Sequence, residues 1–322
     1  MHPLSPFINT NLVLLTHEVT SKEWFRMAME TIQSLYKMIS IERMEAYVNG
    51  EVTFNGCCHI SFDDGDSSVY ENAFPILEEM NIPSSLFVSP MIAKNESNFW
   101  FQELSILQRK LGVKPLKEMI CETLGTSYSQ IENYALNSLF KGMKIEDMWK
   151  VINATKKKFQ IEIDRKFNMT SEQLKEVHYS NLIKIGAHTL NHPILKNETD
   201  DNSKNEIYGS IEELSDLLGE NIRYFAYPNG IPGLDYGQRE ITYLKEKNIK
   251  LAFTADSGFV NKKAAFSITR EGLSGSQKES AFWIRTKLTL LPFLNAIRKY
   301  TAVGRLVEER KEIRDLAIFK SG

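Results

Sequence analysis

The sequence is poor in cysteine and carries little net charge. Its 322 residues include three cysteines, Cys57, Cys58 and Cys121. Adjacent residues of a strand point to opposite faces, so Cys57 and Cys58 argue against a disulfide framework and for reduced, packed thiols. The formal net charge of −2 creates no overall field that would favour nucleic acid or an anionic membrane. We therefore expect no nucleic-acid partner.

Long apolar runs are also missing. The first residues, MHPLSPFINTNLVLLTHEV, have no basic segment, and their apolar run is only a few residues long. A membrane-spanning helix needs about 20 apolar residues, and a signal peptide needs a basic start followed by an apolar segment. This stretch therefore predicts a strand, and a cytoplasmic location is the resulting expectation.

Short apolar runs alternate with helical patterns along most of the chain. Strands are expected at residues 11–17, 57–62, 84–89, 182–187, 224–226, 250–254 and 266–268. Helical patterns cover residues 22–48, 69–80, 170–176 and 204–218, and the third of these begins with the capping-box sequence TSEQ. This alternation predicts a parallel sheet, whose ligands bind at the carboxyl ends of the strands.

Two segments depart from this alternation. Residues 98–166 are rich in Lys, Glu, Met and Leu and have no clear strand, which predicts a helical insertion. Residues 276–322 have an amphipathic helical pattern. The sequence therefore predicts a barrel domain over residues 1–275, with the insertion at about 98–166, and a helical extension over 276–322.

Polar clusters follow three of the expected strands. Asp63-Asp64-Gly65, then His188 and His192 in HTLNHP, and then Tyr227-Pro228-Asn229-Gly230 each come directly after a strand. Each cluster alone is weak, because Asp and Gly are ordinary turn residues and two histidines at this spacing are often unrelated. Together they converge on one face of a parallel barrel, where two imidazoles and a carboxylate suit a divalent metal.

The segments ISFDDG, GAHTLNHP and FAYPNG resemble the first three motifs of the polysaccharide deacetylases, the NodB-homology enzymes of carbohydrate esterase family 4. The resemblance covers roughly residues 11–274, interrupted by the insertion. It implies a distorted (β/α)7 barrel and metal-dependent removal of acetyl groups from N-acetylated sugars.

The resemblance also implies roles for individual residues. Asp63 corresponds to the catalytic base, and Asp64, His188 and His192 correspond to the ligands of a divalent ion, for which zinc is expected. A backbone N–H of the YPNG turn, with Asn229 as the candidate and Tyr227 beside it, is expected to stabilise the oxyanion or contact the substrate. Asp66 is expected to cap the following helix.

Two positions depart from the family pattern. Ala226 stands where the third motif usually has an arginine that orients the base, and Arg270 in SITREGL is the candidate replacement, with an exposed arginine as the alternative. No histidine follows His192, so the usual carboxyl-terminal histidine motif is missing. His17, in LLTHEV, resembles the amino-terminal signature of a subgroup that includes deacetylases of extracellular poly-N-acetylglucosamine. His17 is therefore the expected general acid, with a strand-end packing role as the alternative.

The expected function is thus a metal-dependent deacetylase acting on the N-acetylated sugars of a polysaccharide or glycan precursor. An O-acetyl esterase or small-molecule amidase on the same fold, and a noncatalytic carbohydrate-binding protein, are the alternatives. The mixed aromatic, apolar and basic stretch FWIRTKLTLLPFLNAIRKY is compatible with a membrane surface, but packing on the barrel or in a dimer is favoured.

Overall fold

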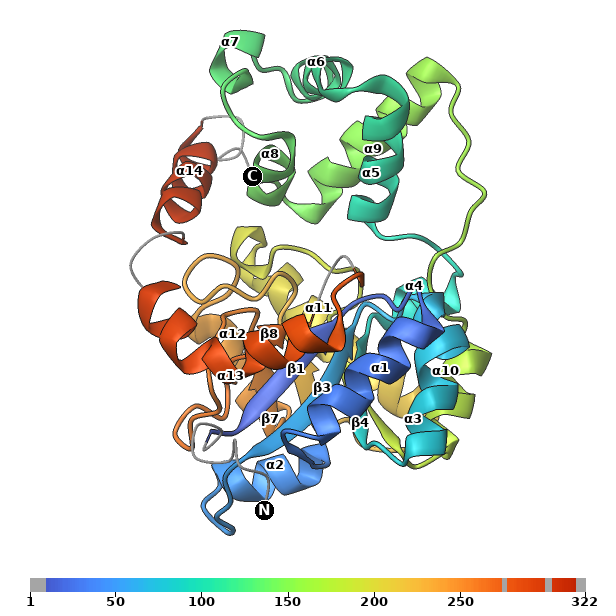
Figure 1. The fold of residues 1–322 in the computed structure, drawn as a ribbon. Helices are drawn as coiled ribbons and strands as arrows, with labels where there is room; N and C mark the ends of the chain where they lie inside the picture. Colours follow the sequence, from blue (N-terminus) through green and yellow to red (C-terminus); the bar gives the residue numbers. More distant parts are fainter. Residues whose placement is uncertain (1–9, 274–276, 299–302, 317–322) are drawn as a thin grey trace.

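A parallel sheet that curls into a half-barrel forms the centre of the molecule (Figure 1). The computed structural model describes residues 10–273, 277–298 and 303–316. The strand order is β7-β6-β5-β4-β3-β1-β8, and β2 also pairs with β3. The strands are β1 (Leu12–Thr16), β2 (Lys37–Met38), β3 (Cys57–Asp63), β4 (Ser84–Val88), β5 (Ile183–Ala187), β6 (Tyr224–Ala226), β7 (Leu251–Phe253) and β8 (Glu271–Gly272).

The central strands are covered on both faces. Every residue of β1, β3 and β4 is buried, which is typical of the central strands of a parallel sheet. The strands predicted at 57–62, 84–89, 182–187 and 224–226 are confirmed to within one residue at either end. Because all strands run in parallel, their carboxyl ends meet at one end of the half-barrel.

Helices surround the sheet. They are α1 (Lys22–Gln33), α2 (Ile41–Val48), the π-helix η2 (Val69–Ala73), α3 (Phe74–Met80), α4 (Pro90–Lys94), α10 (Ser171–Tyr179), the 3-10 helix η3 (Leu195–Asn197), α11 (Asp200–Leu218) and α12 (Gln238–Glu246). The predicted capping box of α10 is confirmed, since Gln173 N–H donates to Thr170 Oγ1 and Thr170 N–H donates to Gln173 Oε1.

The prediction of one helical stretch over residues 22–48 is wrong in its centre. The chain leaves α1 at Ser34, forms the short strand β2, and re-enters a helix at α2, where Ser40 is the N-cap. Lys37 N–H donates to Gly56 O and Ile39 N–H donates to Cys58 O. Pairing with β3 therefore overrides the local helical preference.

Two further differences lie near the carboxyl-terminal part of the barrel. Residues 266–268 form only an isolated bridge between Ile268 and Phe253, and the last strand is β8 instead. Helix α12 was not predicted, because its charged sequence has only two buried residues, Glu240 and Leu244, and hence little apolar periodicity.

Five helices form a separate layer above the barrel in Figure 1, called the helical cap below. They are α5 (Trp100–Leu111), α6 (Val113–Leu124), α7 (Tyr128–Ile131), α8 (Leu136–Gly142) and α9 (Ile145–Phe159). The cap has its own apolar core, in which Leu104, Leu107 and Phe140 are buried. The predicted helical insertion is thus present as a unit with its own packing.

Two helices, α13 (Ala281–Arg298) and α14 (Val303–Asp315), follow the barrel. Helix α13 buries Ile284, Leu288 and Leu291 with the barrel core, and α14 lies against α8 of the cap. The fold class, including the helical tail, is confirmed, whereas the predicted boundary at residue 275 lies outside the described residues.

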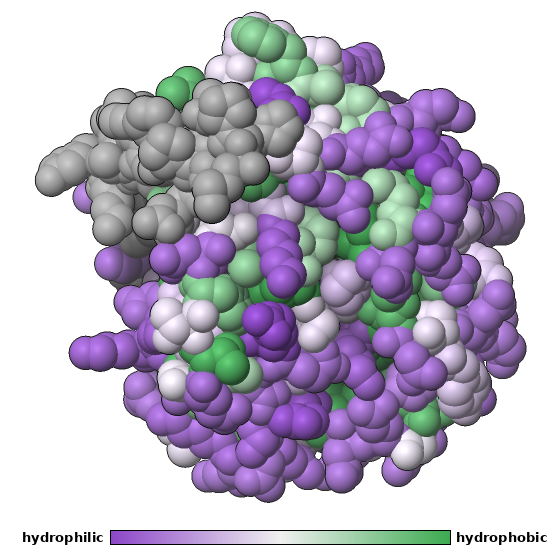
Figure 2. All heavy atoms as spheres, turned by 60° about the horizontal axis from the view of Figure 1, so that its bottom comes forward, coloured by the Kyte–Doolittle hydropathy of each residue, from purple (hydrophilic) through white to green (hydrophobic). Residues whose placement is uncertain are grey.

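The described surface is mostly hydrophilic on the face shown in Figure 2. Apolar residues form small separate groups there. Phe282 and Trp283 of α13 are exposed. Among the described residues, no helix combines the length and the apolar character that crossing a bilayer requires.

Candidate active site

A cavity of about 930 Å³ lies at the carboxyl ends of the strands, between the barrel and the helical cap. Residues after four different strands line it: His17 follows β1, Asp63 and Asp64 end and follow β3, His188 follows β5, and Tyr227 follows β6. Arg270, Asn229 and His192 line it as well. All eight residues singled out from the sequence therefore reach one cavity.

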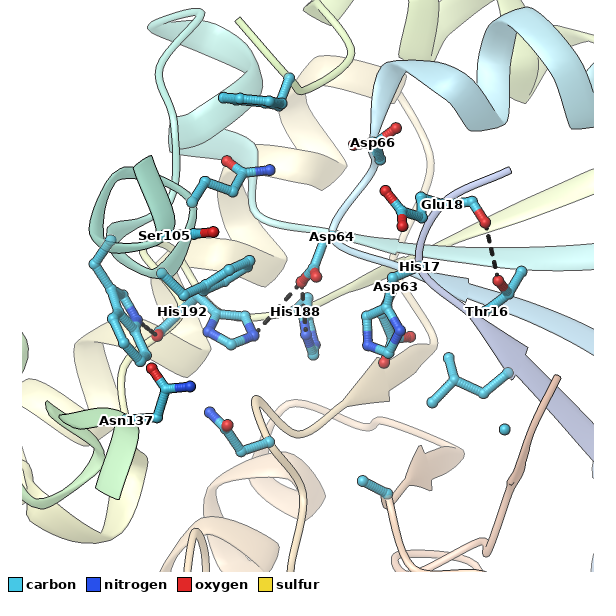
Figure 3. Close-up of a pocket in the computed structure, with 18 of the residues that line it drawn as sticks. Thr16, His17, Glu18, Asp63, Asp64, Asp66, Ser105, Asn137, His188 and His192 are labelled. Carbon is cyan, nitrogen blue, oxygen red and sulfur yellow. Dashed lines mark hydrogen bonds and ion pairs between the residues drawn. The ribbon is translucent and has the colours of Figure 1, made fainter. Parts of the chain in front are cut away.

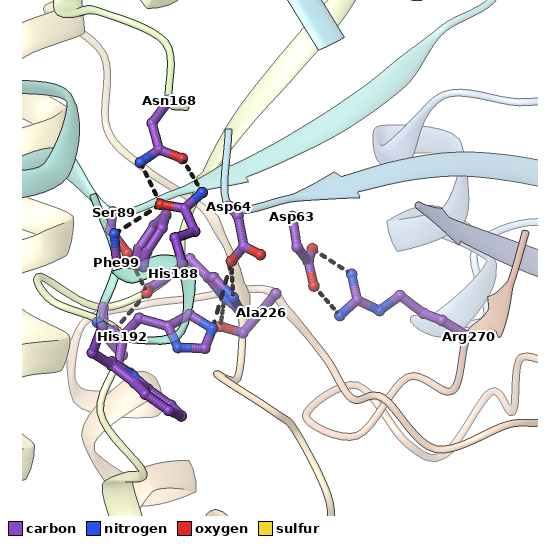
Figure 4. Close-up of polar contacts among 12 residues, drawn as sticks. Asp63, Asp64, Ser89, Phe99, Asn168, His188, His192, Ala226 and Arg270 are labelled. Carbon is purple, nitrogen blue, oxygen red and sulfur yellow. Dashed lines mark hydrogen bonds and ion pairs between the residues drawn. The ribbon is translucent and has the colours of Figure 1, made fainter. Parts of the chain in front are cut away.

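Asp64, His188 and His192, called the Asp–His–His triad below, form a compact group. The Nε2 atoms of both histidines lie 3.5 Å from Asp64 Oδ1, and one ligand atom from each residue lies within 4.8 Å of the others (Figures 3 and 4). Asp64 and His192 adopt positive φ angles of 70° and 60° in the segments that follow β3 and β5. Such backbone conformations are costly for residues other than glycine and are often found at functional sites.

The backbone orients His188. Its Nδ1 lies 2.7 Å from the carbonyl oxygen of Ala226, so Nδ1 carries the proton and the lone pair of Nε2 points to the triad. Ala226 is the position at which the family pattern usually has an arginine, and here it contributes its carbonyl group.

The helical cap orients His192. Trp100 Nε1 donates to the carbonyl oxygen of His192 at 3.0 Å, and the rings of Phe99 and Phe101 meet its imidazole edge to face. Thr189 Oγ1 accepts from the His192 N–H at 3.0 Å. These aromatic contacts were missed at the sequence level, although the FWF sequence at the start of the insertion was the available signal.

Burial and the neighbouring charges shift the pKa values of the triad residues in opposite directions. Burial raises the pKa of the Asp64 carboxyl, but the neighbouring His188, His192 and His17 outweigh this effect and leave the pKa well below its usual range. Burial lowers the pKa of His188, but the adjacent carboxylates of Asp64 and Asp63 outweigh burial, so this pKa is raised. Burial lowers the pKa of His192 to about 3, which keeps this imidazole neutral.

The triad fits a divalent metal ion. Asp64 Oδ1 is buried and has no hydrogen-bond partner within the described residues. In tetrahedral zinc sites, ligand atoms at about 2.0–2.2 Å from the ion stand roughly 3.4 Å apart, close to the 3.5 Å found here. Ligation needs an ionised carboxylate and neutral imidazoles. Asp64 and His192 are already in these states, and a bound ion would displace the proton that the neighbouring carboxylates favour on His188.

Asp63 is bound on its other side by Arg270. The guanidinium donates to both carboxylate oxygens at 2.7 Å, and both side chains are buried (Figure 4). Arg270 Nε also donates to Thr254 O at 2.8 Å. Burial raises the pKa of Asp63, but Arg270 and then His188 outweigh it and lower this pKa below its usual value. Asp63 is therefore an anion held in one orientation.

His17 lies at the rim of the same cavity. It is exposed, and Figure 3 shows its ring beside Asp63, on the side of the triad away from Ser105 and Asn137. His59, in contrast, is buried and does not line the cavity. Its ring is hydrogen-bonded to Ile39 O and Ser85 Oγ inside the sheet.

The remaining predicted residues have different surroundings. Asn229 has a positive φ of 57°, and its buried Nδ2 has no hydrogen-bond partner among the described residues. The Tyr227 hydroxyl donates to Phe266 O at 3.1 Å, and its ring stacks on Tyr236. Asp66 Oδ1 accepts from the Ser68 N–H at 2.9 Å, just before η2.

The fold and the site together define a parallel-barrel protein whose polar side chains line a cavity at the carboxyl ends of its strands. The model of the polysaccharide deacetylase family matches residues 52–252, and the chain belongs to this family. The predicted family is thereby confirmed, and the membership supports deacetylation of sugars as the activity. No curated protein matches the chain.

Solved structures share the fold. IcaB from Ammonifex degensii is 20% identical with a TM-score of 0.57, and the match covers 86% of this chain and 97% of that one. PplD, a deacetylase from Streptococcus pyogenes solved with acetate, is 17% identical with a TM-score of 0.57 (88% and 98% covered). A de-N-acetylase from Aggregatibacter actinomycetemcomitans is 16% identical with a TM-score of 0.57 (87% and 100% covered). The predicted barrel fold is confirmed.

Proposed function

We propose that this protein removes acetyl groups from N-acetylated sugars of a polysaccharide or glycan precursor and uses a divalent metal ion, with zinc expected from the ligand set. The observation that carries the proposal is the placement of the Asp63–Arg270 pair beside the Asp–His–His triad in one cavity. Hydrolysis of an amide by water needs a proton acceptor and stabilisation of negative charge, and these two groups supply both.

The triad would hold the ion, which when bound lowers the pKa of water and stabilises negative charge. Asp63 accepts the proton of the attacking water, because its carboxylate is ionised and lies next to the triad. Arg270 fixes both oxygens of Asp63 and thereby its orientation. Asp63 and Asp64 are adjacent in the chain because one handles the proton and the other binds the ion.

Other residues act on the acetyl oxygen and on the sugar nitrogen. Asn229 lines the cavity, and the backbone N–H of Asn229 in the YPNG turn donates to the acetyl oxygen as this oxygen gains negative charge. His17 donates a proton to the sugar nitrogen as the C–N bond breaks. The oxygen from water stays on the acetyl carbon, so the products are acetate and a free amino sugar.

Acetate release from a panel of N- and O-acetylated glycans tests the proposal. The wild type should release acetate from N-acetylated members, and a chelator should stop the reaction. Asp63→Asn should keep its metal content and lose roughly 100- to 10,000-fold in turnover, whereas Asp64→Asn should lose metal as well. Asp216→Asn is the control and should change neither value, because Asp216 is exposed on α11 and does not line the cavity.

Other outcomes discriminate between the alternatives. Release from O-acetylated members alone would make the protein an esterase. Glycan binding with no acetate release from any member would make it a binding protein. Equal metal loss in Asp63→Asn and Asp64→Asn would contradict the assigned division between base and ligand.

A further inference from the structure

The helical cap contributes a polar wall to the cavity. One face of α5 supplies Phe101, Gln102, Ser105, Gln108 and Arg109, which follow the i, i+3, i+4 spacing of a single helix face. The other face of α5 packs into the core of the cap through Leu104 and Leu107. The polar face of this helix is therefore directed at the cavity.

Helix α8 extends the same wall. Asn137 and Lys141 are four residues apart and line the cavity, whereas Leu139 and Phe140 are buried in the core of the cap. In Figure 3, Ser105 and Asn137 lie on one side of the triad and His17 and Glu18 lie on the other. The cavity thus has a cap wall with amide and cationic groups opposite a wall that carries carboxylates.

Among the described residues, neither cation of the cap wall, Arg109 or Lys141, forms a direct ion pair with a carboxylate. The neighbouring acid of α5, Glu103, instead pairs with Lys156 at 2.8 Å, away from the cavity lining. The barrel cation Arg270 differs, because it forms a buried bidentate ion pair with Asp63. The positive charge on the cap side is therefore less directly balanced than that of Arg270.

The surroundings of Lys141 add to this excess. Arg310 of α14 donates to Asp235 at 2.5 Å and to the backbone oxygen of Lys141 at 3.3 Å. Arg314 lies close to the same pair, and Nε of both arginines is buried without a partner among the described residues. Burial and then Arg310 lower the pKa of Lys141, although Asp235 opposes them. Three cations thus share one carboxylate, and an anion beside Lys141 would relieve their repulsion.

Resting on the deacetylase function above, we propose that Arg109 and Lys141 form a subsite for an anionic group of the glycan substrate. The acetylated sugar lies over the triad, and the anionic group lies against the cap. The shared chemistry is that of an oxyanion, either the phosphate of a phosphorylated glycan or the carboxylate of an acidic sugar, because both accept hydrogen bonds from guanidinium and ammonium groups.

Binding of three matched disaccharides tests this subsite. Each contains N-acetylglucosamine, and the second sugar is neutral, carries a 6-phosphate, or is a glucuronate. Calorimetry with the full chain carrying Asp63→Asn avoids hydrolysis during the titration. The anionic ligands should bind more tightly than the neutral one, and the phosphate and glucuronate arms identify which oxyanion is preferred.

Substitutions then locate the effect. Arg109→Gln and Lys141→Gln should each reduce the ratio of anionic to neutral binding by roughly 10- to 100-fold, the usual worth of a hydrogen bond to a charged group. Lys110→Gln is the matched control, because Lys110 is exposed on the same helix and does not line the cavity. It should leave the ratio unchanged.

The outcomes separate this proposal from the function on which it rests. Equal binding of all three disaccharides, or equal effects of Lys110→Gln and Arg109→Gln, would overturn the subsite. Preferential binding of the anionic ligands that depends on Arg109 and Lys141, without acetate release by the wild type from any of them, would support the subsite and count against the deacetylase.

Discussion

Asp63 and Asp64 are neighbours in the chain, yet their side chains have different partners. Asp63 is the last residue of β3 and is held by Arg270, whereas Asp64 has a positive φ and turns to the two histidines. The change of backbone conformation between the two residues therefore separates the carboxylates. Gly65, with a φ of 75°, continues the turn, and a Cβ there would lie 2.9 Å from Val88 Cγ1.

His17 carries the first prediction at this scale. His17→Gln should lower turnover of an N-acetylated sugar by roughly 100-fold or more, because the leaving amine needs a proton that an imidazole can supply near neutral pH. The loss should be much smaller for an activated ester, whose leaving group departs without a proton. Steady-state kinetics on both substrates measure the difference.

Metal content provides the control for His17. It should stay at the wild-type value, because His17 lies outside the triad. Equal losses on the amide and on the ester would mean that His17 has a packing role and that Asp63 handles both proton transfers.

The sequence predicted which residues gather in the cavity, because each follows a strand and parallel strands end together. Arg270 was only a candidate, because it is 207 residues away from Asp63 in the sequence. No local sequence pattern predicts a contact between residues that far apart. The contacts of Trp100, Phe99 and Phe101 with His192 were missed, because the placement of the cap over the barrel depends on tertiary packing.

At the scale of elements, His59 joins three segments of the sheet. Its Nδ1 lies 2.9 Å from Ile39 O, just after β2, and its Nε2 lies 2.9 Å from Ser85 Oγ of β4. A neutral imidazole satisfies both, donating to the carbonyl and accepting from the hydroxyl. Burial lowers the pKa of His59 to about 4.

This environment predicts a pH dependence of stability. The pKa of His59 is lower in the folded chain than in the unfolded one, so its contribution is complete above about pH 6.5 and is lost as the pH falls towards 4. The loss should be roughly 3 kcal/mol over this window, at 1.4 kcal/mol for each pKa unit. Urea unfolding at several pH values measures it.

His59→Gln, which cannot titrate, should flatten this part of the pH dependence, whereas His178→Gln on the half-buried surface of α10 should leave it in place. An identical slope in the wild type and His59→Gln would show that other groups cause the dependence.

Some strands and helices were easier to predict from the sequence than others. Strand β1 was predicted well because burial on both faces leaves a continuous apolar run, LVLL. Short pairings such as β2 and β8, each of two residues, carry no such run and arise from contacts with a neighbouring strand. Helix α12 has too few buried residues to show a period.

At the scale of the whole molecule, α14 connects the cap to the barrel. Its Arg310 contacts Asp235 in the barrel loop after β6 and the carbonyl of Lys141 in the cap. Asp235 and Arg310 are each 1% exposed, so this ion pair is fully enclosed. Arg310→Met should destabilise the protein by about 3–5 kcal/mol, because it leaves Asp235 buried without its counter-charge.

Urea unfolding of single and double variants checks this value. Adding Asp235→Asn to Arg310→Met should recover part of the loss, because it removes the buried charge. Arg26→Met is the control, since the pair of Arg26 with Glu79 is exposed and should cost less than about 1 kcal/mol. Equal losses from Arg310→Met and Arg26→Met would contradict the enclosed pair.

Because Asp63 pairs with Arg270, the order of synthesis along the chain determines when the residues of the cavity are all present. During synthesis, Asp63, Asp64, His188 and His192 all leave the ribosome before Arg270 does. A nascent chain that ends before Arg270 therefore has every ligand of the triad, but its Asp63 is a carboxylate without a buried counter-charge. The residue that holds Asp63 in one orientation is therefore made after every residue of the triad.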